Sequence, residues 1–324
     1  MTKKLTLAGI LKRIGLTLLM MSSLFNGLSI GAQGGAVSDL SERQQQATQL
    51  VPQSYQLNAM EPEKLAEFYE EMIGLTLLEL EADTYYRLGT PAGETLLEIF
   101  PAQFQKTQAT TGLYHTAFLF ADRALLGSAV AHLLEQKVLL HGFTDHNVSE
   151  AAYLADPEGN GIELYSDTSR TTWRYDVGGY VEMGNNPLDI TALLLLREDY
   201  NGFRDATSVG HFHLAVNNIA AAEDFYHLVM GLGATSAPDD QTAFFASGGY
   251  HHHLGTNTWL SANTPASGEG EQGLRAVIWQ TESETDLAYI VSQLEENGYE
   301  YDVSDEGLRF QDAAGIIHIV QVSV

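Results

Sequence analysis

Cysteine is absent from all 324 positions of the chain. Disulfides, zinc–thiolate sites, iron–sulfur clusters and cysteine nucleophiles are therefore excluded together. The absence fits both oxidising and reducing compartments, so it does not indicate where the protein works. Any metal site in this chain must be built without thiolates.

Basic residues are few, with 16 Lys and Arg against 42 Asp and Glu and a formal net charge of −26. A negative field of this size repels nucleic acid and anionic lipid. We find no basic patch with interleaved aromatic residues, so nucleic-acid binding is not predicted. An acidic surface does not forbid a dimer, and homo-oligomer formation stays open.

Long apolar runs are missing everywhere except near the N-terminus. The first 38 residues carry no Asp or Glu, hold Lys3, Lys4, Lys12 and Arg13, and continue into an apolar run that ends in small residues. This pattern predicts a signal peptide or a loose membrane anchor over residues 1–34. A disordered or amphipathic extension is the alternative. Residues 35–52, rich in Gln and Ser, are interpreted as a tether.

Hydrophobic residues make up 44% of the chain, enough for a proper core. An internal repeat organises that core. A Phe-Tyr pair precedes a Gly-Leu pair by the same offset at Phe68 and at Phe225, which predicts two equivalent amphipathic helices ended by glycine. A second type of segment, a strand opened by Gly-Leu and then a longer helix, begins at Gly112 and again at Gly273.

The repeat predicts four modules, each reading strand, helix and three strands. Module one spans about 53–104, module two 112–168, module three 209–262 and module four 272–324. The predicted domain organisation places modules one and two in 53–168, a connecting arm in 169–208, and modules three and four in 209–324.

Four phrases, taken in order, resemble the vicinal oxygen chelate superfamily, which includes glyoxalase I, bleomycin-type resistance proteins and extradiol dioxygenases. The phrases are Gly112-Leu113-Tyr114-His115, the stretch 145–151 around His146, the stretch 156–163 ending in Glu163, and the stretch 248–255 with three consecutive histidines. The greatest likeness is to bacterial catechol 2,3-dioxygenase-like proteins. The resemblance implies an α+β fold in which four βαβββ modules pair into two open, barrel-like sheets.

The same resemblance implies where metal ligands lie, because the superfamily places them on the first and last strands of a module. On the first strands the equivalent positions hold Ser54, His115, His211 and Ala276, and on the last strands of modules two and four they hold Glu163 and Ile319. Only modules two and three therefore supply a complete set, His115, His211 and Glu163. We expect these two modules to face each other around the metal, whereas many extradiol dioxygenases use modules three and four.

Three further residues are carried over from extradiol enzymes. Tyr153, ten residues before Glu163, matches a tyrosine that hydrogen-bonds the substrate oxygen. His146 matches a histidine beside bound dioxygen, although the family spacing is slightly longer. His252 is chosen from His251-His252-His253 as the acid–base histidine, on the expectation that neighbouring residues of a strand point to opposite faces.

The resemblance implies a metal-dependent extradiol dioxygenase that opens a catechol-type aromatic diol with O2. The expected cofactor is Fe(II), with Mn(II) as the alternative. A glyoxalase-type isomerase or lyase is a second hypothesis, but its usual second carboxylate is missing where the histidine triple stands. A protein that sequesters a small molecule, such as an antibiotic, is the third. The resemblance implies a cytoplasmic protein, whereas the N-terminal segment suggests export or anchoring.

Overall fold

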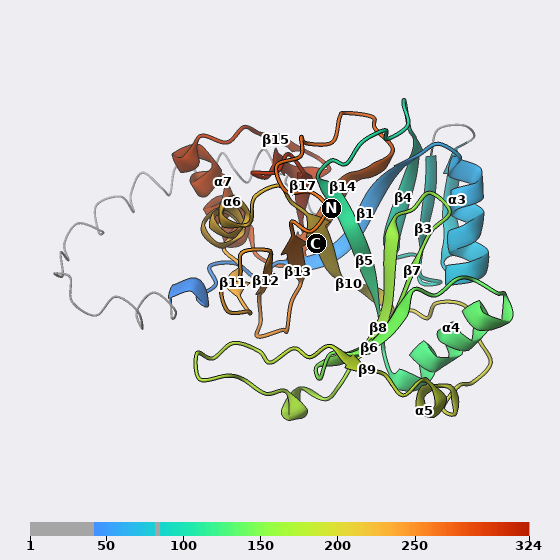
Figure 1. Ribbon diagram of the computed structural model, residues 1–324. Helices are drawn as coiled ribbons and strands as arrows, with labels where there is room; N and C mark the ends of the chain where they lie inside the picture. The colour runs from blue at the N-terminus through green and yellow to red at the C-terminus, as the bar shows by residue number, and fades with distance from the viewer. Residues whose placement is uncertain (1–41, 82–84, 324) are drawn as a thin grey trace, which may run out of the picture.

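The computed structural model describes residues 42–81 and 85–323 and places two large mixed sheets side by side (Figure 1). The first strands of the four modules run through the middle of the molecule. Helices α3, α4 and α5 lie toward one end of the molecule, and α6 and α7 toward the other. The predicted N-terminal leader, residues 1–34, lies outside the described residues.

Sheet one has eight strands in the order β15-β16-β17-β14-β1-β4-β3-β2 and contains modules one and four. Its strands are β1 (Val51–Ala59), β2 (Thr76–Glu81), β3 (Tyr85–Gly89), β4 (Thr95–Pro101), β14 (Gly273–Thr281), β15 (Tyr301–Ser304), β16 (Gly307–Gln311) and β17 (Ile317–Val322). The two modules join where β1 and β14 pair antiparallel.

Sheet two has nine strands in the order β11-β12-β13-β10-β5-β8-β7-β6-β9 and contains modules two and three. Its strands are β5 (Gly112–Phe120), β6 (Gly142–Asp145), β7 (Ser149–Ala155), β8 (Gly161–Asp167), β9 (Asn186–Pro187), β10 (Ser208–Ala215), β11 (Gly233–Ala234), β12 (Thr242–Ala246) and β13 (Leu254–Asn257). Here β5 and β10 pair antiparallel. Modules two and three, which we expected to face each other around the metal, thus lie in one sheet.

The helices follow the predicted pattern, with two changes of winding. They are α3 (Pro62–Phe68), α4 (Arg123–Glu135), α5 (Ile190–Leu194), α6 (Ile219–Asp224) and α7 (Glu284–Asn297), with a short 3₁₀ turn η2 (Arg170–Thr172). In modules one and three the helix ends in a π-helical turn, η1 (Tyr69–Ile73) and η3 (Phe225–Val229). Both turns stop at or just before a glycine with positive φ, Gly74 and Gly231.

The two sheets share one hydrophobic core. Alternate residues of the central strands point into it, because successive side chains of a strand face opposite sides. The rings of Tyr55 and Phe212 lie 6.5 Å apart, and those of Phe212 and Trp279 lie 5.5 Å apart, so sheets one and two are joined by aromatic packing. The opposite faces of the same strands are left to line the two concave sides.

Residues 42–50, in the segment interpreted as a tether, pack against module three. The Ala47 amide donates to the Gly231 carbonyl (2.8 Å), the Thr48 hydroxyl donates to the Met230 carbonyl (2.7 Å), and Leu50 is fully buried. Strand β1 already begins at Val51. Across the described ranges, none of the helices combines the length and apolar character needed to cross a membrane.

Candidate metal centre

Strand register brings the three predicted ligands to one face of sheet two. His211 on β10 pairs with Ala117 on β5, and Ala117 pairs in turn with Glu163 on β8. Residues in register across neighbouring strands point to the same side, so these three side chains form a row. His115 lies two residues before Ala117 on β5 and shares that face. The three side chains thus lie around Ala117, whose methyl side chain is small enough to leave room for them to approach one another.

The three functional groups meet at one carboxylate oxygen. The Nε2 atoms of His115 and His211 lie 3.0 Å and 3.1 Å from Oε2 of Glu163. One possible ligand atom from each residue falls within 4.8 Å of the others, and this is the cluster of metal-ligating type that the described residues contain. The exposed fractions of the three residues are 7%, 2% and 3% for His115, His211 and Glu163.

The protonation states match what a metal requires. Burial lowers the pKa of His211 to about 4, so its imidazole is neutral at neutral pH. Burial acts to raise the pKa of Glu163, but the two imidazoles that face it outweigh that effect and hold its pKa well below the usual range. A neutral imidazole and an ionised carboxylate are the forms that bind cations.

The hydrogen bonding within the cluster is incomplete. His211 Nε2 meets the geometry of a hydrogen bond to Glu163, but the buried Nε2 of His115 does not, despite its 3.0 Å separation. A buried polar atom without a partner is costly. A cation between the two nitrogens and the carboxylate oxygen would satisfy all three at once. Two histidines and one carboxylate are the ligand set of a facial triad with open positions. The cluster can thus bind a metal ion.

Tyr153 and His146 border this cluster as one hydrogen-bonded pair. Tyr153 on β7 pairs in register with Glu163, so it extends the same row. His146 Nε2 lies 2.7 Å from the Tyr153 hydroxyl, and its Nδ1 lies 2.7 Å from the Gly184 carbonyl. Burial, and then the charge of Glu163, raise the pKa of Tyr153 far above its usual value, so it stays a phenol. Both ring nitrogens of His146 have hydrogen-bond partners, and Tyr153 links this histidine to the cluster.

The histidine triple is arranged differently from the expected strand. Residues 251–253 form a bend before β13, and the expected alternation does not hold there. The rings of His252 and His251 both lie near His211, at 4.2 Å and 6.4 Å between centroids. His253 instead stacks on Tyr250, with 4.8 Å between ring centroids.

A carboxylate that the sequence interpretation missed stands behind the triple. Oδ1 of Asp167 lies 3.0 Å from His251 Nε2, and His251 Nδ1 lies 2.8 Å from His252 Nδ1. The Tyr250 hydroxyl also donates to Asp167, over 3.2 Å. Asp167 follows Glu163 by four residues on β8 and so lies on the same face. That spacing was the available indication of its role.

His213 is a second residue whose position the sequence interpretation missed. It pairs in register with His115, and their ring centroids lie 4.9 Å apart. Its Nε2 is buried without a hydrogen-bond partner among the described residues, and burial holds its pKa well below the usual value. Being two residues from His211, it shares the ligand face, which a strict alternation rule would have shown.

With the fold and this geometry established, comparison with known proteins defines the class. The family model described as Glyoxalase/Bleomycin resistance protein/Dioxygenase superfamily matches residues 52–164 and 208–307. The chain belongs to this superfamily.

Individual proteins of known name or structure give more specific comparisons. The chain is 35% identical over 269 residues to the catechol-2,3-dioxygenase of Bacillus subtilis (strain 168), covering 80% of this chain and 93% of the relative. A putative dioxygenase from Bacillus subtilis subsp. subtilis str. 168 superposes with a TM-score of 0.58 at 15% identity, covering 85% of this chain and 86% of that one. Glyoxalase I from Zea mays gives a TM-score of 0.52 at 13% identity, covering 84% and 92%. At these identities the two solved structures support the fold alone, and the predicted fold of four modules in two open sheets is confirmed.

Proposed function

We propose that this protein is a metal-dependent extradiol dioxygenase that cleaves a catechol-type diol with O2. The observation that carries the proposal is the convergence of two imidazoles and one carboxylate at a buried face, bordered by a phenol on one side and a histidine on the other. The 35% identity to a protein named catechol-2,3-dioxygenase supports the same conclusion.

The metal we propose is Fe(II), with Mn(II) as the alternative, held by His115, His211 and Glu163. When bound, such an ion lowers the pKa of a coordinated diol hydroxyl and lets electrons pass from the ring to O2. The aromatic carbon–carbon bond next to the diol breaks, and both oxygen atoms of O2 enter the product, a hydroxymuconic semialdehyde. In the described residues no second carboxylate joins the cluster, which weighs against glyoxalase-type chemistry.

We assign His252 as the proton acceptor, and the hydrogen bonds around it support this role. The Asp167 carboxylate can only accept, so His251 donates to it from Nε2. In the arrangement that we propose, the Nδ1 lone pair of His251 accepts from Nδ1–H of His252, 2.8 Å away. The tautomer left to His252 carries its lone pair on Nε2. Burial first, and then the neighbouring histidines, hold the pKa of His252 well below its usual value. The ring is therefore neutral and has a lone pair for a substrate proton, but the same lowering of the pKa makes it a weak base.

Tyr153 is assigned to the other substrate oxygen. Nδ1–H of His146 donates to the Gly184 carbonyl, and in the arrangement that we propose the Tyr153 hydroxyl donates to Nε2 of His146. The Tyr153 oxygen remains free to accept a hydrogen bond. It therefore suits the diol hydroxyl that keeps its proton while His252 takes the other proton. This division of roles fits a substrate bound as its monoanion.

The test is anaerobic reconstitution with Fe(II), followed by catechol and air, with absorbance of the yellow ring-opened product as the readout. Glu163→Gln keeps the side-chain volume but removes the charge, and we expect it to lose both colour and metal. The loss of metal affinity should exceed the roughly 10–100-fold typical of outer-shell substitutions. Glu79→Gln, which removes a carboxylate paired with Arg87 in sheet one, is the matched control and should keep both.

Two outcomes would overturn the proposal in different ways. Stoichiometric iron without colour, across several catechols, would keep the metal site and redirect the assignment to isomerase or lyase chemistry. Failure of the wild type to take up metal would remove the triad and leave a protein that sequesters a small molecule.

A further inference from the structure

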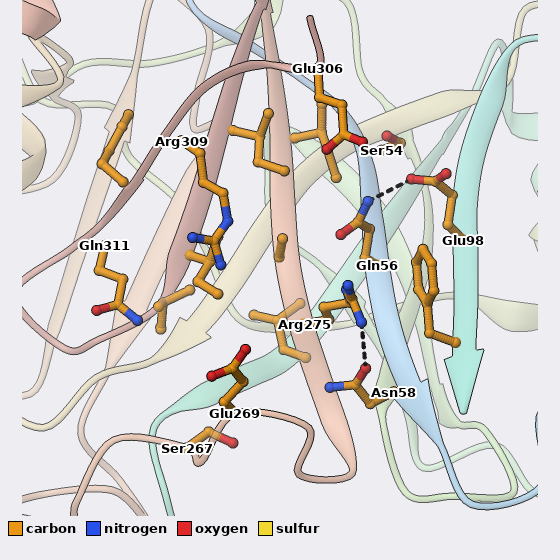
Figure 2. Close-up of a pocket in the computed structure, with 18 of the residues that line it drawn as sticks. Ser54, Gln56, Asn58, Glu98, Ser267, Glu269, Arg275, Glu306, Arg309 and Gln311 are labelled. Carbon is orange, nitrogen blue, oxygen red and sulfur yellow. Dashed lines mark hydrogen bonds between the residues drawn. The ribbon is translucent and has the colours of Figure 1, made fainter. Parts of the chain in front are cut away.

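The concave side of sheet one encloses a cavity of about 1420 Å³ that has no part in the metal centre (Figure 2). Its wall is formed by β1, β4, β14, β16 and β17, and the loop 267–270 closes one end. The cavity is the counterpart of the proposed metal site, because each sheet is built from two modules of the same kind, joined through an antiparallel pair of their first strands.

The strand register of sheet one shows which residues occupy the positions that the proposed metal ligands occupy in sheet two. On β17, Ile319 pairs with Ile278 of β14 and with Arg309 of β16. In sheet two the equivalent strand carries Glu163, paired with Ala117 and Tyr153. Ile319 therefore replaces the carboxylate ligand, and Arg309 replaces the tyrosine. Ser54 and Ala276 likewise stand at the two histidine positions, so this cavity has lost every ligand of the metal triad.

An apolar floor replaces the metal cluster. Ala276, Ile278 and Ile319 pack on one another, with Ile317 against them, as a cluster separate from the main core. They lie on the cavity side of their strands and line it. A surface of this kind favours the face of a ring or a short hydrocarbon body.

Arg309 supplies a cation without a partner. Its side chain reaches into the cavity, and no hydrogen bond or ion pair joins it to another described residue (Figure 2). Arg309 is exposed, and Asp302 of β15 lies opposite it in register without forming a salt bridge to it. Its planar fork of donors matches a carboxylate.

Arg275 provides a second cation that is held in place without a carboxylate. The β1–β14 register shifts between Gln56 and Leu57, which leaves Arg275 outside the ladder. Its guanidinium carbon lies 4.2 Å from the centroid of the Phe100 ring, and Nη1 is 3.5 Å from Asn58 Oδ1. The side chain is thus positioned before any ligand arrives.

The acidic residues of the cavity limit the charge of its ligand. Glu98 is already engaged, accepting from Gln56 over 2.8 Å and from the Tyr85 hydroxyl over 2.6 Å. The other acidic residues that line the cavity are Glu94, Glu269, Glu300, Asp302, Glu306 and Asp312. Carboxylates around the opening disfavour phosphates and other multiply charged anions. A ligand with one negative charge and an apolar ring could contact the arginines with its charge and the apolar floor with its ring.

We infer that this cavity is a second, metal-independent binding site for a small aromatic monocarboxylate, with its carboxylate on Arg309 and its ring on the floor of Ala276, Ile278 and Ile319. Arg275 adds a supporting positive charge. The site does not depend on the proposed ring-cleavage activity, since it shares no residue with the metal centre.

The experiment is a titration of the full-length protein with benzoate, in which calorimetry or ligand-observed NMR measures the binding. Charge-assisted hydrogen bonds predict that Arg309→Gln weakens benzoate binding by about 10-fold or more. Arg309→Lys keeps the charge but loses the fork, and should recover part of the affinity. Arg87→Gln removes a guanidinium of the same sheet that is paired with Glu79, outside the cavity, and is the matched control.

Glu163→Gln separates this site from the metal centre and should leave benzoate affinity within about 2-fold, because the two sites lie in different sheets. The inference is overturned if Arg309→Gln, checked by circular dichroism to be folded, binds benzoate as the wild type does. It is also overturned if wild-type protein shows no benzoate binding, or if benzylamine binds more tightly than benzoate, since the acidic residues would then select the ligand.

Discussion

A single methyl group sets the geometry of the proposed metal centre. Ala117 lies in register between His211 and Glu163 and is fully buried. A larger residue there would fill the space in which the imidazole nitrogens approach the carboxylate. The ligand set thus depends on a residue with no chemistry of its own, which shows why ligand types alone do not define such a site.

At the residue scale, Asp167→Asn tests the hydrogen-bonded path to His252. The amide can donate where the carboxylate could only accept, so the tautomers of His251 and His252 are no longer fixed. We expect kcat to fall by about 10²- to 10⁴-fold, the range of general acid–base catalysis, with metal content unchanged. Steady-state kinetics with metal analysis on the same preparation provides the measurement.

Tyr250→Phe is the companion variant, because it removes the other hydrogen bond to Asp167 and leaves the histidine path intact. Its effect on kcat should be clearly smaller. A fall in kcat for Asp167→Asn that is matched by loss of metal would show that Asp167 only supports the fold.

The family resemblance, applied to the aligned modules, predicted His115, His211 and Glu163 as one set, and the structure brings these three residues together. The sequence interpretation did not reveal Asp167 or His213, whose roles depend on which side chains are adjacent in space. The bend at residues 251–253 also hid the arrangement of the triple, since three identical residues carry no periodicity to distinguish strand from loop.

At the element scale, substituting two glycines that have nearly the same φ distinguishes the cost of backbone strain from the cost of a steric clash. Gly231, after η3, has φ +70°, and an added Cβ would lie 2.9 Å from Tyr289 and 3.0 Å from Ala47. Gly298, which caps α7, has φ +73° with open space around it. We expect Gly298→Ala to cost about 1 kcal/mol of unfolding free energy and Gly231→Ala about 3 kcal/mol.

Denaturant unfolding of the two variants measures this difference. Equal losses would mean that the 42–50 segment, which includes Ala47, moves aside without cost. The prediction ties the stability of η3 to the segment that packs on it.

The element boundaries were largely accessible from sequence. The longer helix predicted after the strand at Gly112 is α4 (Arg123–Glu135), which begins where the Asp122 carboxylate caps the backbone N–H of Leu125. The π-helical turns η1 and η3 were not expected, since nothing in an apolar periodicity separates a widened last turn from an ordinary one. The packing of residues 42–50 was also missed, because a Gln- and Ser-rich composition favours exposed chain.

At the scale of the whole molecule, the shared aromatic core predicts that both sheets unfold together. Phe212 is fully buried between Tyr55 of sheet one and other core residues. Phe212→Ala should lower the free energy of unfolding by about 3–5 kcal/mol. We expect one transition, coincident by circular dichroism and tryptophan fluorescence, for the variant and for the wild type.

Two separated transitions in that experiment would show that the sheets are independent folding units. Phe212→Leu keeps much of the apolar volume, so its free energy of unfolding should lie between those of Phe212→Ala and the wild type.

The interleaving of the modules has a consequence for how the protein is made. Strand β1 leaves the ribosome first, yet its central partner is β14, where Val51 pairs with Gln280 near the end of the chain. Modules two and three are both complete before module four is synthesised, so sheet two can assemble during translation. During that time, the edge of β1 that pairs with β14 stays unpaired. The half of the molecule with the metal ligands should therefore fold first. A nascent chain that stalls before β14 would expose an open strand edge, the feature most prone to aggregation.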